Sequence, residues 1–540
     1  MEKLLLLGDE AVAQGAIDGG MSGMYAYPGT PSTEIMEYIQ RSKVAVERNI
    51  HRQWSANEKT AMEASLGMSY AGKRAMVSMK HVGLNVAADA FINSAITGVN
   101  GGIIVTVADD PSMHSSQNEQ DSRFYGKFAQ IPILEPANQQ EAYDMAYDAF
   151  DISEKFGVPV LIRLTTRLSH SRSGVQTREP KNQKEIVYPD DPLQFVLLPF
   201  NARKRYHLLL EKQPDFEQAS ENSPYNIYYD GKDKSLGIIT SGIAYNYLME
   251  NFPGNDCPYP VLKIGQYPLP YEKLKKIDDE CDKLLLLEEG YPFIEELMRG
   301  ILDKEKNIIG KLDGTIPRQG ELTPNVVAAA LNKGNGKSFD IPDVVANRPP
   351  QFCPGCAHKD IYDALNETMV EYGSQKVFSD IGCYTLGALP PYNAIHSCVD
   401  MGASITMAKG AADAGIKHAV AVIGDSTFTH SGMTALLDCV NENSPITVII
   451  ADNAAVAMTG GQHSAATGHL EKICEGLGVN PDHIRVVTPL KKYHEEIVNV
   501  LKEEIEYDGV SVVIPRRTCV VVAAKERKAE RAKKEKVKSV

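Results

Sequence analysis

Two apolar runs that each end in a polar loop constrain the fold of this chain most. The first run, residues 419–423, breaks at Gly424 and Asp425, and the second, residues 446–451, breaks just before Asn453. Apolar side chains recur at helical spacing between the runs, so the pattern predicts strand, loop, helix, strand. Ligands of parallel α/β sheets bind at the carboxyl ends of the strands. We therefore expect Asp425 and Asn453 to lie side by side at a binding edge.

These two side chains and the carbonyl group of Ala455 form a set of hard oxygen ligands. Mg²⁺ prefers such ligands and completes its octahedral shell with phosphate oxygens and water. The spacing resembles the thiamine diphosphate motif, in which an Asn follows Gly-Asp-Gly at a similar distance, although Ser426 stands here in place of the second Gly. The alternative is an ordinary α/β turn with an Asp and an Asn on the surface.

Length and charge limit the classes of protein to consider. A chain of 540 residues exceeds what one hydrophobic core supports, so several domains are expected. A formal net charge of -14 argues against general nucleic-acid binding, because phosphate backbones attract basic surfaces. No apolar run approaches the ~20 residues that span a bilayer, and the N-terminus does not resemble a signal peptide. We expect a cytoplasmic protein without nucleic-acid or membrane partners.

Strand-like runs that end in polar loops recur along the chain and predict an α/β fold. Runs at residues 4–7, 75–79, 101–108 and 158–164 alternate with helical stretches, which predicts a doubly wound, parallel-sheet domain. A second domain of this kind contains the Asp425 unit, and a smaller α/β domain lies between the two. The expected boundaries are residues 1–175 for the first domain, 176–234 for a surface connector, 235–335 for the smaller domain, 336–350 for a linker, 351–524 for the last domain and 525–540 for a solvated basic tail.

The first domain offers a carboxylate suited to a pyrimidine ring. A helix is expected over residues 53–70, with Glu58 in its first turn, where a carboxylate interacts favourably with the helix dipole. That capping role is the simplest interpretation. Thiamine diphosphate, however, requires a Glu that hydrogen-bonds its pyrimidine ring, and two similar domains suit a cofactor with two separate ends. Earlier in the chain, a Pro/Gly turn at residues 28–31 follows a strand, and Ser32 or Thr33 is expected to cap the helix that begins after this turn.

Four of the nine cysteines form a distinct group. Cys353 and Cys356 make a CxxC hairpin, Cys383 follows another loop, and Cys519 lies near the chain end. Four thiolates suit a structural Zn²⁺ or a [4Fe–4S] cluster, and an incidental arrangement is the alternative. The remaining cysteines are scattered, as in a reducing compartment.

Two histidines follow predicted strands in loops that could form part of an active site. His81 and His430 are candidates for substrate orientation or proton transfer. The alternative for each is a histidine that packs and hydrogen-bonds structurally.

Seven segments occur in the order of a known family: YPGTPSTE, MKHVGLNVAADAF, ADDPSMHSSQNEQDSRFYG, FCPGCAHK, SDIGCYTLG, GDSTFTHSG and DNAAVAMTGGQ. Over residues 1 to about 522 the chain resembles the α subunits of indolepyruvate ferredoxin oxidoreductases, which carry Gly-Asp-Ser. The resemblance implies oxidative decarboxylation of indolepyruvate or a related aryl 2-oxo acid with coenzyme A. The products are an aryl-acetyl-CoA, CO₂ and reduced ferredoxin, formed by attack of the thiamine ylid on the keto carbon.

The resemblance also implies roles for individual residues. Asp425, Asn453 and the Ala455 carbonyl bind Mg²⁺ and the diphosphate beside Gly424 and Ser426. Glu58 activates the pyrimidine and Thr30 faces the reacting centre. Cys353, Cys356, Cys383 and Cys519 match the ligands of one [4Fe–4S] cluster, through which electrons leave. A smaller β subunit is the implied partner in a heteromer.

Two departures from the family pattern affect these expectations. No ferredoxin-like run of cysteines follows Cys519, so the tail from Lys525 is expected to attract an acidic ferredoxin instead. Asp109 and Asp110 occupy the place of the substrate-binding Arg of pyruvate enzymes, which predicts a bulkier substrate. Two other functions stay open: a non-redox thiamine-dependent decarboxylase or carboligase, and a cofactor-binding subunit whose chemistry needs a partner chain.

Overall fold

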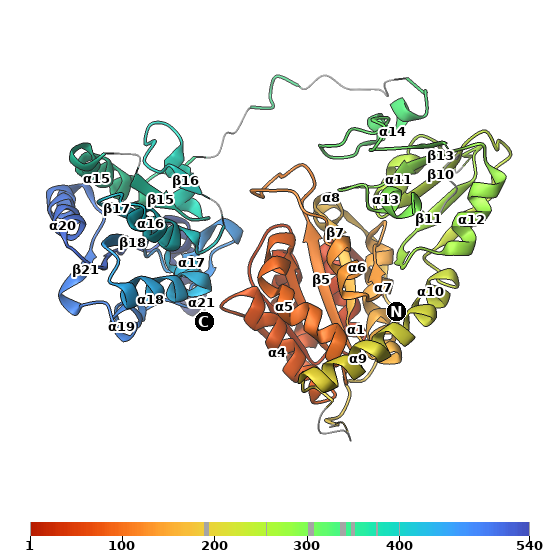
Figure 1. The fold of residues 1–540 in the computed structure, drawn as a ribbon, viewed down its shortest axis with the longest axis horizontal. Helices are drawn as coiled ribbons and strands as arrows, with labels where there is room; N and C mark the ends of the chain where they lie inside the picture. The colour runs from red at the N-terminus through yellow and green to blue at the C-terminus, as the bar shows by residue number, and fades with distance from the viewer. Residues whose placement is uncertain are drawn as a thin grey trace. The chain divides into compact units, whose positions relative to one another are not determined.

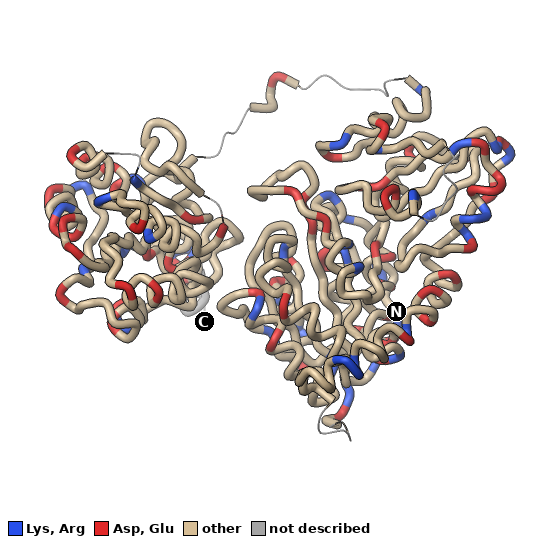
Figure 2. The backbone as a smooth tube through the Cα atoms, viewed as in Figure 1, with Lys and Arg blue, Asp and Glu red and all other residues tan. Residues whose placement is uncertain are grey.

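The chain forms two compact units in a computed structural model, Met1–Ile341 and Pro342–Val540, and each is described by itself (Figure 1). Acidic and basic residues are interspersed along both units, so the excess of acidic residues is not gathered in one segment (Figure 2). No helix in the described part of the chain is both long and apolar enough to cross a membrane. The structure describes residues 2–187, 189, 194–254, 256–300, 307–334, 342–346, 351–373, 376–398 and 400–538, with side chains to residue 531.

The first unit contains a seven-stranded sheet, as the alternating runs predict. Its strands β2 to β7 are parallel, and alternate residues of each strand enter opposite cores. In β4, Met76 joins the core under helices α1 and α7, whereas Val77 and Met79 join the core under α4 and α5. The sheet order is β12 (Gln266–Tyr267), β6 (Ile133–Leu134), β7 (Val160–Thr165), β5 (Ile103–Asp109), β4 (Ala75–Lys80), β2 (Gly23–Ala26), β3 (His51–Trp54), and the helices are α1 (Gly8–Asp18), α7 (Gln139–Phe156), α4 (Glu58–Tyr70) and α5 (His81–Thr97).

A smaller five-stranded sheet belongs to the same unit. Its strand order is β14 (Asn307–Ile309), β13 (Lys283–Leu287), β10 (Gly237–Ser241), β11 (Val261–Ile264) and β9 (Ile227–Tyr229). The two sheets are connected because β12, which follows β11 in the chain, pairs antiparallel with β6 of the larger sheet.

Some expectations for this unit were wrong in detail. The run at residues 4–7 forms β1 (Lys3–Leu7), but β1 pairs antiparallel with β8 (Arg172–Gln176), outside the seven-stranded sheet. The helix expected over residues 53–70 starts only at Glu58. Asn57 caps it by accepting a 2.8 Å hydrogen bond from the backbone N–H of Thr60, while residues 51–54 form strand β3.

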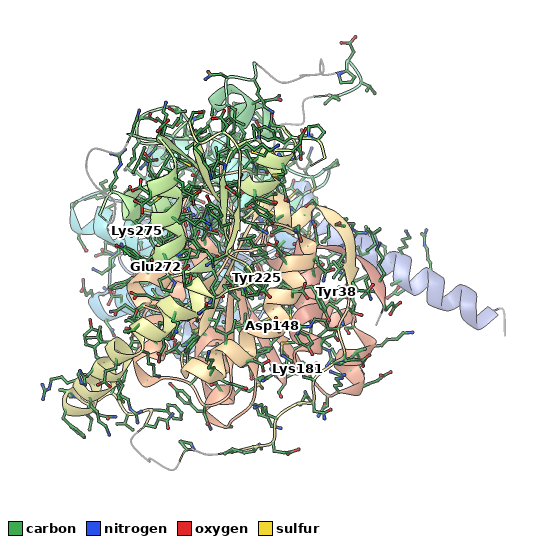
Figure 3. The ribbon with its side chains drawn as sticks, turned by 90° about the vertical axis from the view of Figure 1, so that its right-hand side faces the viewer. Tyr38, Asp148, Lys181, Tyr225, Glu272 and Lys275 are labelled. Carbon is green, nitrogen blue, oxygen red and sulfur yellow. The ribbon has the colours of Figure 1, made fainter. Side chains whose placement is uncertain are left out.

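The connector expected over residues 176–234 has more structure than its composition suggested. It contains helices α9 (Pro199–Glu211) and α10 (Gln213–Glu221), each of which buries few residues and so shows a weak apolar period. The Tyr225 hydroxyl, just beyond α10, donates to Asp148 of α7 at 3.2 Å (Figure 3). The connector therefore packs against the helix layer of the first sheet.

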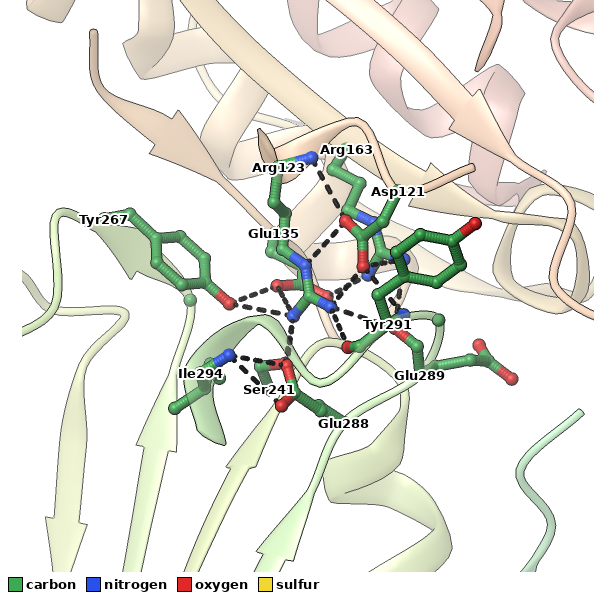
Figure 4. A network of polar contacts seen from close by, with 12 residues as sticks. Asp121, Arg123, Glu135, Arg163, Ser241, Tyr267, Glu288, Glu289, Tyr291 and Ile294 are labelled. Carbon is green, nitrogen blue, oxygen red and sulfur yellow. Dashed lines mark hydrogen bonds and ion pairs between the residues drawn. The ribbon is translucent and has the colours of Figure 1, made fainter. Parts of the chain in front are cut away.

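A buried network of charges joins the larger and smaller sheets of the first unit (Figure 4). The Arg163 guanidinium, on β7, lies 2.6 Å from Asp109 and 2.6 Å from Glu135. Arg123 lies 2.9 Å from Glu288, which follows β13. Both arginine side chains have no solvent exposure, so each depends on these carboxylates to offset the cost of burying its charge.

Arg163→Met should therefore lower the free energy of unfolding by about 3–5 kcal/mol, because it leaves the buried Asp109 without its cation and leaves Glu135 only the 3.7 Å contact with Arg123. Arg178→Met is the matched control, since Arg178 is 42% exposed and pairs with Asp148 at the surface, and it should cost less than about 1 kcal/mol. Urea denaturation of both variants measures the difference. Equal midpoints for the two would show that the network contributes little.

The second unit has a six-stranded parallel sheet, which confirms the predicted fold class. Its strand order is β16 (Ser397–Cys398), β15 (Val377–Ser379), β17 (Ala419–Gly424), β18 (Ile446–Ala451), β22 (Ser511–Pro515) and β21 (Ile484–Val487). Val420 and Val422 of β17 face the core of α15 (Ala357–Tyr372) and α20 (His494–Glu506). Ala421 and Ile423 face the core of α16 (Ala403–Asp413) and α18 (Met433–Glu442).

The C-terminal tail of this unit differs from expectation, and much of the linker before the unit lies outside the residues that the structure describes. The basic tail, expected to be frayed, continues helix α21 (Val520–Lys538). Most of the linker expected at residues 336–350 lies outside the described residues.

Candidate functional site

The carboxyl ends of β17 and β18 bring the segments of Asp425 and Asn453 together. The two strands are adjacent and parallel, paired from Ala419 with Ile446 through Gly424 with Ala451. Asp425 begins the short helix α17 (Asp425–Thr427) directly after β17. The strand arrangement that the sequence predicted is therefore present, and both polar residues follow strands at the same edge of the sheet.

Asp425 has the character of a ligand without its cation. Its residue is 2% exposed, and its Oδ2 atom has no hydrogen-bond partner among the described residues. Burial and the charge of Asp452 raise the pKa of Asp425 to about 7, against the opposing effect of a hydrogen bond with the Ser464 hydroxyl. A buried carboxylate is costly without a counter-charge, and a bound Mg²⁺ would supply one. The donor set at this edge thus fits the ion.

The turn after β18 is held by its own hydrogen bonds. Asn453 Oδ1 accepts from the backbone N–H of Ala455 at 3.0 Å. Ala454 adopts a φ of 59°, and Ala455 enters the short strand β19 (Ala455–Val456), which pairs with β20 (Gln462–His463). Amide oxygens have two lone pairs, so Asn453 retains one for a ligand. The turn is consequently built before any ligand arrives.

The two positions flanking Asp425 differ in what they permit. A Cβ atom on Gly424 would lie 2.5 Å from a ring carbon of Tyr384, so only glycine fits there. The Ser426 hydroxyl is buried and has no hydrogen-bond partner within the described residues. Ser426 therefore offers an additional polar group for an anionic ligand.

A second cluster of predicted residues lies at the carboxyl edge of the first unit, in the segments that follow β2, β3, β4, β5 and β7. Glu58 is 4% exposed, and a Cβ on Gly83 would lie 2.5 Å from Glu58 Oε1. Its carboxylate therefore packs against the first turn of α5, where only glycine leaves room. Glu58 is also the first residue of α4, as the helix-dipole interpretation expects, while Asn57 supplies the side-chain cap.

Hydrogen bonds between Gly29 and the side chains of Ser32 and Thr33 hold the turn that contains Thr30. Ser32 Oγ donates to the Gly29 carbonyl at 2.8 Å, and Thr33 Oγ1 accepts from the Gly29 N–H at 3.1 Å. Neither side chain caps helix α2 (Thr33–Arg41), so that prediction was wrong. The Thr30 carbonyl accepts a 3.4 Å hydrogen bond from Ser115 Oγ.

The two candidate histidines have different surroundings. His81 is 1% exposed, and its Nε2 lies 3.2 Å from the Asn118 carbonyl. Burial and the neighbouring charge of Lys80 lower the pKa of His81 to about 4, so the ring is neutral and Nε2 carries the proton. His430 lies in the π-helical turn Phe428–Gly432 of the second unit, where its Nδ1 hydrogen-bonds the Ser431 hydroxyl.

Asp109 and Asp110, expected to indicate a bulkier substrate, are engaged internally. Asp109 pairs with Arg163 in the buried network. Asp110 accepts from Ser116 Oγ at 2.6 Å and from Thr166 Oγ1 at 2.7 Å. These contacts explain the presence of both carboxylates by their structural roles. Neither residue therefore indicates the size of the substrate.

The four grouped cysteines come from three segments that interact. The Cys353 carbonyl accepts from the Cys356 N–H at 3.1 Å, and Arg517 donates to the Gly355 carbonyl between them. Burial, together with the charges of Cys356, Cys519 and Cys353, raises the pKa of Cys383 to about 12, so the four thiols lie within electrostatic range of one another. Nevertheless, nowhere in the described residues do three or more Cys, His, Asp or Glu side chains form a group ready to hold a metal ion. The chemistry of four thiols fits a four-thiolate metal site, but the thiols are not close enough together to bind one ion or cluster as they stand.

Sequence reasoning missed Lys80, which ends β4 at the carboxyl edge and is 9% exposed. A signal was present, because a lysine at the end of the apolar run AMVSMK is unusual in a buried strand.

Two family models match separate parts of the chain. Residues 14–215 match the family described as pyruvate flavodoxin/ferredoxin oxidoreductase, thiamine diP-bdg. Residues 380–514 match the thiamine pyrophosphate enzyme, C-terminal TPP binding domain. The carboxyl edge that holds Glu58 and the edge that holds Asp425 each fall within one of these matches.

Curated relatives match almost the whole chain. The indolepyruvate oxidoreductase subunit IorA of Archaeoglobus fulgidus is 38% identical over 98% of this chain and 88% of its own length. That of Pyrococcus abyssi is 38% identical over 96% of this chain and 86% of its own length. A solved 2-oxoglutarate:ferredoxin oxidoreductase from Magnetococcus marinus, 17% identical, shares the fold with a TM-score of 0.50 over 61% of this chain and 65% of that one. The chain therefore belongs to the family of indolepyruvate oxidoreductase IorA subunits.

Proposed function

We propose that this chain is the thiamine-diphosphate-binding subunit of an enzyme that oxidatively decarboxylates an aryl 2-oxo acid with coenzyme A. The observation that carries the proposal is the buried Asp425 carboxylate at a strand end beside the Asn453 turn, one oxygen of which has no partner among the described residues. The aryl 2-oxo acid is inferred from the names of the IorA relatives. The products would be an aryl-acetyl-CoA, CO₂ and two electrons for a carrier such as ferredoxin.

The residues at the edge of the second unit would hold the diphosphate end of the cofactor. Asp425, Asn453 and the Ala455 carbonyl would bind Mg²⁺ and so neutralise the diphosphate, with Gly424 and Ser426 beside them. When bound, thiamine diphosphate supplies a carbon nucleophile for the keto group and stabilises the negative charge left by the loss of CO₂.

The remaining candidates would act on the substrate and on the cofactor's pyrimidine. Glu58 would hydrogen-bond the pyrimidine ring and hold it in the reactive tautomer. Thr30 and His430 would orient the substrate. The neutral His81 ring has a buried Nδ1 without a partner among the described residues, and this atom would accept a hydrogen bond.

Electrons must leave the site, and the grouped cysteines would provide the first stage. Cys353, Cys356, Cys383 and Cys519 would bind one [4Fe–4S] cluster, for which four thiolates are the usual ligands. The relatives are named as subunits, which supports a heteromer with a smaller β subunit. Binding a cluster would require the thiols to close up from their present arrangement.

Anaerobic purification of the chain, alone and with its partner, tests the proposal. Thiamine, magnesium, iron and sulfide would be counted on one sample, and coenzyme A-dependent oxidation of indolepyruvate would be followed with a neutral dye. One thiamine and about four iron atoms per chain, with coenzyme A-dependent turnover, are expected. Thiamine without iron, with release of an aldehyde, would instead identify a non-redox decarboxylase. Thiamine binding without turnover unless a partner is added would identify a cofactor-binding subunit.

Cys383→Ala should remove most of the bound iron and the visible absorption, because one of four cluster ligands is lost. Cys398→Ala is the matched control, since Cys398 is also half-buried in the second unit but belongs to the scattered set. Iron and sulfide analysis of both proteins measures the effect. Equal iron content in the two variants would contradict the assignment of Cys383.

A further inference from the structure

We infer that the Lys80 ammonium group binds the carboxylate of the 2-oxo acid substrate. This inference rests on the proposed function and extends it, because that function requires a group that recognises the carboxylate next to the reacting keto carbon. Lys80 ends strand β4 at the carboxyl edge of the first unit, directly before His81.

Lys80 is a buried cation that has no carboxylate partner among the described residues. Lys80 is 9% exposed, and no described carboxylate lies within 4 Å of its Nζ. Buried Arg163 and Lys263, in contrast, each pair directly with a carboxylate. Removing an ammonium group from water is costly unless a counter-charge is present. Lys80 therefore lacks what an anionic ligand would supply.

The hydrogen bonds that the Lys80 ammonium group makes are weak. The group donates to the Ser115 carbonyl at 3.3 Å and to Ser115 Oγ at 3.5 Å, both long for a charged donor. Asp110 contributes its charge from beyond Ser115, whose N–H donates to Asp110 Oδ2 at 2.8 Å. Ser116 and Thr166 also donate to Asp110, so this carboxylate is already well solvated by the protein.

Lys80 lies beside the turn that contains Thr30, a residue proposed to act on the substrate. A Cβ on Gly29 would lie 3.1 Å from Lys80 Cβ, which places the lysine stem against the turn that contains Thr30. Ser115 Oγ, next to the ammonium group, donates to the Thr30 carbonyl. Burial lowers the pKa of Lys80 to about 8, against the opposing effect of the Asp110 charge, so the group is still mostly charged at neutral pH.

A buried lysine elsewhere in the same unit provides a matched comparison. Lys311 is 6% exposed and also has no ion pair among the described residues, yet its ammonium group donates to the Gly290 carbonyl, next to the network of Figure 4. Burial without an ion pair is thus common to Lys80 and Lys311 and does not by itself indicate a ligand. Of these two lysines, it is Lys80 that contacts Ser115, which in turn hydrogen-bonds the Thr30 carbonyl.

Calorimetric titration of the purified, thiamine-loaded complex tests the inference without turnover. The probes are indole-3-lactate and its neutral amide, which keep the aryl group but lack the reactive keto carbon. The wild-type complex should bind the acid about 10- to 100-fold more tightly than the amide. Lys80→Met should remove this preference while leaving amide binding unchanged, and Lys80→Arg should keep most of it. Lys311→Met, the control, should leave the preference intact.

Each outcome separates this inference from the proposed function. A wild-type complex that does not prefer the acid, or a Lys80→Met variant that still does, would overturn the assignment of Lys80. If lactate binds more tightly than indole-3-lactate and its preference over lactamide is lost in Lys80→Met, Lys80 binds the carboxylate but the aryl substrate class is wrong.

Discussion

Asp425→Ala is expected to abolish Mg²⁺-dependent binding of thiamine diphosphate. The change removes one of three proposed protein ligands and the only full negative charge among them, and hard cations depend strongly on ligand charge. One carboxylate oxygen, the buried Oδ2, has no hydrogen-bond partner among the described residues and is available to a cation. The loss should therefore appear in cofactor binding, with little damage to the fold.

Calorimetry with thiamine diphosphate, at several Mg²⁺ concentrations, measures this effect in the purified complex. Asp438→Ala is the matched control, because Asp438 is an exposed residue of the neighbouring helix α18. Asp425→Asn should show a smaller loss, since its amide keeps one oxygen ligand but no charge. Unchanged cofactor affinity in Asp425→Ala would remove the metal site from this edge of the sheet.

The arrangement of the second unit could be predicted because its signals are local. Strands β17 and β18 are apolar runs that stop at polar residues, and a parallel sheet brings consecutive strand ends to one edge. The predicted neighbours Asp425 and Asn453 followed from that rule alone. The hydrogen bonds that hold the Asn453 turn, and the approach of Tyr384 to Gly424, depend on contacts between distant segments and gave no local signal.

The first unit shows more clearly what local patterns omit. The network of Arg123, Arg163 and their carboxylates joins segments more than 100 residues apart, so composition and periodicity could not reveal it. Asp109 therefore looked like a substrate feature in the sequence, whereas the structure pairs it with Arg163. The helix expected from residue 53 failed for a different reason: residues 51–54 pair in parallel with β2, and this pairing overrides their local helical preference.

Glu58→Gln is expected to slow turnover by about 10²- to 10⁴-fold while leaving thiamine diphosphate binding nearly intact. A carboxyl group can share a proton with the pyrimidine ring and so favour the tautomer that takes up the C2 proton, whereas a neutral amide cannot. The shape of the side chain is preserved, which matters because Glu58 packs tightly against Gly83 in the first turn of α5. The expected defect is thus chemical rather than structural.

Hydrogen–deuterium exchange at C2 of the bound cofactor, followed by NMR, isolates the step in which Glu58 is proposed to act. Exchange should be slow in Glu58→Gln and normal in Glu63→Gln, the control, because Glu63 lies on the same helix but is 47% exposed and pairs with Lys59. Substrate and electron acceptor are absent from this measurement, so a defect in Lys80 or in the cysteines would not affect it. Wild-type exchange in Glu58→Gln would mean that another group favours the reactive tautomer, and the buried position of Glu58 would then be explained by its packing against α5 alone.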